Sequence, residues 1–232
     1  MATSLDLQEQ EQLDALKAFW KQYGNLVTWV LILALGAYAA WNAWNWWQRD
    51  QATKAGAMFE ELDRAAAAGD VDRATRVFDD LKERYPRTAV ATLGGLAAAR
   101  LQFEKGRPDA AKATLTWLTE HAGDGEHRAL ARLRLAGVLL DAKKFDEALR
   151  QLDAIESLHF EALVADRRGD VLLAQGKPDE AAKAFQRSWA AMDPKLDYRR
   201  LVEAKLVSLG KTPEARDAGA ARSSPASAGA SQ

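Results

Sequence analysis

The feature that most constrains this chain is an uncharged stretch from Gln22 to Gln48, in a sequence of which 28% is charged. At about 1.5 Å per residue, Leu26 to Trp47 would extend roughly 33 Å as a helix, enough to cross the hydrocarbon core of a bilayer. Six of the eight tryptophans lie between Trp20 and Trp47, and aromatic rings with a polar edge favour the headgroup zone. The stretch therefore predicts one transmembrane helix over residues 22–48.

Two other interpretations of this stretch remain open. A buried core helix would normally be shorter or amphipathic, whereas this stretch is apolar on every side. The segment Ala37-Tyr38-Ala39 fits the small-x-small pattern of a signal-peptide cleavage site. However, residues 1–21 carry four acidic side chains against two lysines, and a signal peptide begins with a short basic segment. We therefore favour an uncleaved anchor.

Composition bounds the rest of the chain. Residues 49–210 are enough for one domain with a sizeable core. The formal net charge of −1 and the absence of a basic run argue against a nucleic-acid binder, which needs clustered basic charge. The lack of cysteine excludes disulfides, thiolate metal sites and cysteine nucleophiles, and it is compatible with an oxidising compartment.

The chain divides into four parts by composition. Residues 1–21 form a leader, whose apolar residues have roughly the spacing of a short amphipathic helix. The transmembrane helix follows over 22–48, and alanine-rich helical sequence continues over 49–210. Residues 211–232 are mostly Ala, Ser, Gly and Pro, which cannot bury enough apolar surface to offset the entropy of ordering. We predict a disordered tail there.

Between the anchor and the tail the chain repeats itself. Four short segments share one pattern, in which Gly (once Lys) is followed by Asp and then Ala, at residues 69–74, 106–111, 143–148 and 176–181. The glycine would end one helix, the Asp would complement the dipole of the next, and the alanine would let two helices approach closely. Large apolar residues follow four positions after each alanine, at Phe78, Leu115, Leu152 and Phe185.

These repeats resemble tetratricopeptide repeats, whose helix pairs recur at about 34 residues. The key alanines are 37, 37 and 33 residues apart, and the longer spacings predict longer links between repeats, such as residues 121–127. The first repeat departs from the pattern, with Leu62 where a small residue is expected. A last helix over residues 197–209 would cover the open end of the stack. The predicted fold class is all-α, a single N-terminal transmembrane helix followed by a tetratricopeptide-repeat-like α-solenoid.

A closer resemblance covers nearly the whole chain up to Gly210. It rests on the end of the leader, on the end of the span and on a late segment, at residues 19–25, 36–44 and 160–172. Together these look like the YfgM-type ancillary subunits of the SecYEG translocon. The resemblance implies a single-pass protein of the bacterial inner membrane, with a cytoplasmic N-terminus and a periplasmic repeat domain. It implies the SecYEG translocon and the periplasmic folding factor PpiD as partners, besides membrane lipid and translocating or unfolded envelope proteins.

The sequence offers little for catalysis or metal binding. His121 and His127 flank a glycine-rich turn, but two histidines make a poor closed metal site. Asp166 and Asp170 stand one helical turn apart and could form a carboxylate pair, although the arginines between them favour ion pairing. No nucleotide-binding, zinc-protease or serine-hydrolase motif is present. We expect no enzyme activity, no metal and no cofactor.

The repeat pattern favours a binding groove over a catalytic pocket as the functional surface. In stacked helix pairs the first helices line the concave side, which binds extended or helical peptides. The resemblance places there Leu93, Leu96, Arg100 and Phe103 of the second repeat, Leu130, Leu133, Leu140 and Asp141 of the third, and Leu163, Asp166, Asp170 and Leu173 of the fourth. The leucines could instead pack between repeats. A second open alternative is an envelope scaffold that assembles partner proteins without contacting translocating chains.

Overall fold

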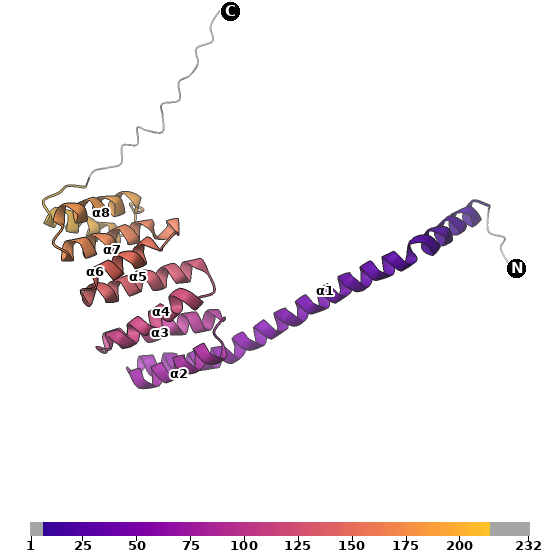
Figure 1. Cartoon of the computed structure of the whole chain (residues 1–232), viewed down its shortest axis with the longest axis horizontal. Coiled ribbons are helices and arrows are strands. Elements are labelled where there is room, and N and C mark those ends of the chain that lie inside the picture. The colour runs from indigo at the N-terminus through magenta and orange to yellow at the C-terminus, as the bar shows by residue number, and fades with distance from the viewer. Residues whose placement is uncertain (1–6, 214–232) are drawn as a thin grey trace, which may run out of the picture. The chain divides into compact units, whose positions relative to one another are not determined.

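The computed structural model of the chain describes residues 7–213, and every regular element in that range is a helix (Figure 1). The elements are α1 (Leu7–Ala67), α2 (Val71–Arg84), α3 (Ala89–Glu104), α4 (Pro108–His121), α5 (Gly125–Asp141), α6 (Phe145–Asp153), the short 3-10 helix η1 (Leu158–Phe160), α7 (Glu161–Ala174), α8 (Pro178–Ala191) and α9 (Tyr198–Ser208). The all-α fold class is confirmed. Most of the predicted disordered tail and the start of the leader lie outside the described residues.

The chain separates into two compact units, residues 1–54 and 55–232. In the first unit, α1 contains a segment that is long and apolar enough to cross a membrane. None of the residues in its most apolar 18-residue segment is buried. The sequence predicts that the transmembrane segment begins at residue 22 and ends at residue 48. The helix continues without a break through both of these points. At the second of these points Lys54 pairs with Asp50 one turn earlier, at 2.7 Å, which supports continued helix. The two boundaries stay predictions.

In the second unit, the four predicted turns join the two helices of each pair. Gly69, Gly106 and Gly176 have φ of 69°, 74° and 77°, and Lys143 has φ of 57°. Each turn closes with a hydrogen bond from the residue after it to a carbonyl five residues earlier, such as Arg107 N to Gln102 O at 2.8 Å. This is the Schellman ending, which requires the left-handed conformation and therefore favours glycine. The helix pairs are α1–α2, α3–α4, α5–α6 and α7–α8.

Close packing inside and between the pairs depends on small residues. The key alanines Ala74, Ala111, Ala148 and Ala181 are all buried, as are the large residues four positions later. A Cβ atom on Gly95 would lie 2.8 Å from Phe78 and 2.9 Å from Leu118, so α3 needs a glycine there to approach its neighbours. Gly94 is also close to its neighbours, since a Cβ atom there would lie 3.2 Å from Leu81.

The second unit is a stack in which each helix lies beside its neighbours in sequence (Figure 1). At its C-terminal end α9 packs on α8, with Val202 and Leu206 buried beside Phe185. The predicted terminal helix is confirmed, since α9 (Tyr198–Ser208) occupies the expected residues. It covers apolar surface that would otherwise face water at the end of the stack.

Candidate binding groove

Two adjoining clefts lie along the first helices of the repeats. One, of about 490 Å³, is lined by residues of α3 and α5 and by Asp63 and Ala66 at the end of α1. The other, of about 500 Å³, is lined by residues of α3, α4 and α5 and by Arg167 of α7. Both clefts are lined by Arg100, Glu104 and Arg134. We call the two clefts together the groove.

The groove has an exposed apolar part on α3. Leu93 is 47% exposed and Phe103 is 40% exposed, and these residues line one cleft each. Leu96 lies between them in sequence but is only 6% exposed and belongs to the core. Leu130 of α5 is partly buried and also lines the groove. Large exposed apolar side chains in a cleft are what a partner segment could cover.

The charged part of the groove lies mainly on α5. Arg134 and Asp141 are exposed and line it, each about one turn from Gly137 on opposite sides. Arg100 of α3 pairs with Glu104 of the same helix at 2.7 Å. Burial and repulsion from Arg100 lower the pKa of the Arg134 guanidinium.

The other leucines expected in the groove are arranged differently. Leu133 and Leu140 are partly buried and pack against the central core, so replacing them would also change folding stability. Leu163 and Leu173 of α7 are exposed but line neither cleft. The structure thus brings together Leu93, Arg100, Phe103, Leu130 and Asp141, and it leaves the α7 leucines on a separate surface.

Asp166 and Asp170 of α7 are held by α9 rather than open to a partner. Lys205 Nζ lies 2.8 Å from a carboxylate oxygen of each. The hydroxyl of Tyr198 donates to Asp166 at 2.7 Å, and Asp166 is only 2% exposed. Burial, the hydrogen bond to Asp166 and the negative charge of Asp166 raise the pKa of Tyr198. The pair therefore ties the terminal helix to the last repeat. Its close cation is Lys205 and not the neighbouring arginines we expected, of which Arg167 lies 3.6 Å from Asp170 and Arg168 pairs with Asp153.

The two histidines near the third repeat have local partners. The predicted link over 121–127 is shorter than expected, because α5 begins at Gly125 with Asp124 as its N-cap. Asp124 accepts from the backbone N–H of His127 at 2.8 Å and faces its ring, and these contacts lower the pKa of Asp124. His121 stacks on Trp117. Within residues 7–213, no group of three potential metal-binding side chains comes together.

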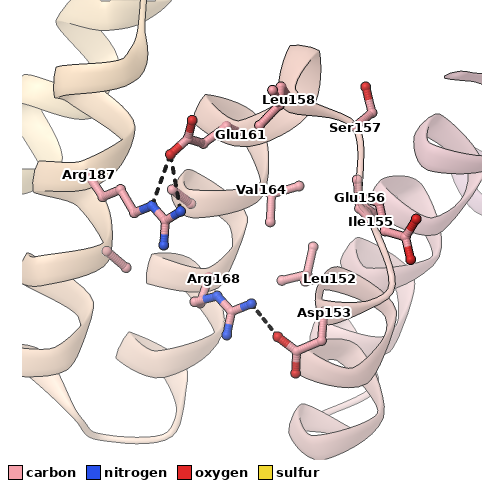
Figure 2. Close-up of a pocket in the computed structure, with 12 residues that line it drawn as sticks. Leu152, Asp153, Ile155, Glu156, Ser157, Leu158, Glu161, Val164, Arg168 and Arg187 are labelled. Atoms are coloured by element: carbon pink, nitrogen blue, oxygen red, sulfur yellow. Dashed lines mark hydrogen bonds and ion pairs between the residues drawn. The ribbon is translucent and has the colours of Figure 1, made fainter.

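A separate pocket of about 270 Å³ lies between α6, α7 and α8 (Figure 2). Its two arginines are both paired, Arg168 with Asp153 and Arg187 with Glu161. Leu158 of η1 stands exposed at its edge. Because each arginine in this pocket has an acidic partner, the pocket offers no unpaired guanidinium.

Sequence reasoning missed Arg134, Gly137 and Arg167. The signal that could have found Arg134 and Gly137 is the spacing of the face of α5 that lines the groove, Leu130, Arg134, Gly137 and Asp141, with steps of four, three and four residues. The matching face of α3 carries Leu93, Ala97, Arg100 and Glu104. The resemblance instead placed Leu133 and Leu140 in the groove, and it included none of the three missed residues.

The chain is similar in sequence to a known domain family and to known proteins. The tetratricopeptide repeat-like domain family matches residues 17–211. A protein of Neisseria gonorrhoeae (strain ATCC 700825 / FA 1090) named ancillary SecYEG translocon subunit is 32% identical over 204 residues, which cover 88% of this chain and 98% of that protein. A protein of the same name from Escherichia coli K12 is 32% identical over 181 residues, which cover 77% of this chain and 85% of that protein. One from Haemophilus influenzae is 25% identical over 182 residues, which cover 78% of this chain and 89% of that protein.

Proposed function

Because this chain belongs to the family of ancillary SecYEG translocon subunits, we propose that it is a membrane-anchored interaction protein that binds partner segments in the groove beside the translocon. Its tetratricopeptide-like domain is a non-catalytic protein-interaction module. The observation that carries the groove assignment is the pair of adjoining clefts in which Leu93 and Phe103 are exposed. Such clefts suit an extended or helical segment of another protein.

We further propose that α1 crosses the inner membrane once, with the N-terminus in the cytoplasm and the repeat domain in the periplasm. Lys17 and Lys21 on one side of the span balance Arg49 and Lys54 on the other, so the positive-inside rule does not decide the orientation. The family resemblance supports it instead. Protease added to spheroplasts should digest the domain after residue 54, and a fully protected domain would contradict this orientation.

The groove assignment is tested by site-specific photocrosslinking in the membrane. A photoreactive phenylalanine analogue replaces Phe103, and a stalled secretory chain is produced in the same cells. We expect ultraviolet light to join position 103 to the stalled chain. Crosslinks from position 103 only to SecYEG or to PpiD would favour the scaffold alternative, in which the protein assembles partners without contacting clients.

The matched control places the same analogue at Glu120, which is exposed on α4 and lines neither cleft. Position 120 should give few or no crosslinks to the stalled chain. Equal crosslinking from positions 103 and 120 would mean that the contact is unspecific, and it would count against the groove.

A further inference from the structure

Arg134 occupies the middle of the groove, where the two clefts meet. Its only hydrogen bond to the described residues is from Nη1 to the carbonyl oxygen of Leu96, at a long 3.3 Å. No carboxylate of residues 7–213 forms an ion pair with it, because the nearby Glu104 is taken by Arg100. Arg134 therefore presents an unpaired guanidinium in a partly dehydrated cleft.

The other arginines that line pockets in this domain differ from Arg134. Arg168 and Arg187 each have a carboxylate partner in the pocket of Figure 2. Arg167, which shares a cleft with Arg134, lies 3.6 Å from Asp170. A guanidinium has five N–H donors in a fixed fork that matches a carboxylate. Arg134 uses one of these donors in the bond to Leu96, which leaves the fork free to bind a carboxylate from outside the domain.

The surroundings of Arg134 leave room for such a ligand. Gly137 lies one turn further along α5, and a Cβ atom there would have no neighbour closer than 3.8 Å. Phe103 of α3 and Arg167 of α7 line the same cleft. A segment in the groove could thus place an apolar side chain against Phe103 while a carboxylate meets Arg134.

We propose that Arg134 is the anion anchor of the groove, and that it selects partner segments that carry a carboxylate beside apolar residues. This inference rests on the proposed function, because it names the chemistry of the segment that the groove takes. The carboxylate is that of an Asp or Glu side chain within the segment, because Arg134 lies where the two clefts meet and the groove continues on both sides of it. Such a side chain presents two oxygens to the guanidinium.

The test uses the full chain in detergent micelles and isothermal titration calorimetry with three synthetic twelve-residue peptides. All have leucine at alternate positions with serine and glycine between. One has a central Glu and an amidated C-terminus, the second has Gln in place of Glu, and the third has Gln and a free C-terminal carboxylate. We expect the Glu peptide to bind about tenfold more tightly than the neutral peptide, and the free-carboxylate peptide to bind less tightly than the Glu peptide. A free-carboxylate peptide that binds more tightly than the Glu peptide would overturn the assignment to an internal side chain.

Arg134→Gln should reduce this preference to less than about twofold, because the Gln side chain carries no charge to attract a carboxylate. The control is Arg132→Gln, on the same helix but outside both clefts, which should keep the preference. Equal binding of all three peptides to the unmodified chain, or a preference that survives in Arg134→Gln, overturns the inference. If none of the peptides binds, the inference also fails, whereas the proposed function is judged separately by the crosslink from position 103.

Discussion

Asp166 and Arg134 both lie on first helices of the repeats, yet of these two only Asp166 has an ion-pair partner among residues 7–213. Asp166 is enclosed and receives hydrogen bonds from Tyr198 and Lys205, both on α9. Arg134 faces the groove with one long bond to a backbone carbonyl. A charge removed from water is costly unless it is paired. The Asp166 charge is matched within the chain, whereas the Arg134 charge is left for something outside it.

Asp166 stabilises the fold and Arg134 is available for binding because the two residues lie at different places in the stack. The terminal helix α9 closes the last repeat and brings its own cation to the acidic pair on α7. The middle of the groove has no such cover, and Arg134 and Phe103 remain exposed there. In a solenoid, where each repeat contacts mainly its neighbours, the end of the stack and its middle can therefore take different roles with similar helices.

The largest expected effect comes from removing the cation that matches Asp166. Lys205→Met should lower the free energy of unfolding by about 3 kcal/mol, because it leaves an enclosed carboxylate with Tyr198 as its remaining partner. Lys183→Met on the exposed face of α8 is the control and should change stability by less than about 0.5 kcal/mol. Chemical denaturation followed by circular dichroism measures both. Similar stabilities for the two variants would mean that the α9 contact is not a structural ion pair.

Much of this fold was predictable from the sequence, because it depends on local patterns. The left-handed turns favour glycine, which occupies three of the four, and the close helix contacts favour alanine; both recur at the expected positions. The continuation of α1 past residue 49 was not predictable from composition, since a change from apolar to charged residues does not end a helix. The unpaired state of Arg134 was hidden for another reason. It depends on Arg100 and Glu104 pairing with each other on a different helix.

Two glycines differ in packing between the region around Asp166 and the region around Arg134. Gly169 lies one turn after Asp166, and a Cβ atom there would clash with the ring of Phe185. Gly169→Ala should therefore cost about 2 kcal/mol through overpacking. A Cβ atom on Gly137 beside Arg134 would make only an ordinary contact with Arg167, at 3.8 Å, so Gly137→Ala should stabilise α5 by about 0.5 to 1 kcal/mol. The same denaturation experiment checks both, and effects of equal sign would contradict the difference in packing.

The smallest expected effect is also the most specific to the groove. Arg134→Met keeps most of the apolar stem and removes a charge that burial and Arg100 both disfavour, as the lowered pKa of Arg134 indicates. Solvent screens this exposed group, so we expect the free energy of unfolding to stay the same or to rise by less than about 1 kcal/mol. Thermal unfolding at low salt gives the clearest measurement, because salt weakens the repulsion from Arg100. If Arg134→Met instead lowered the melting temperature by several degrees, Arg134 would be stabilising the fold as Asp166 does, and the contrast between the two regions would fail.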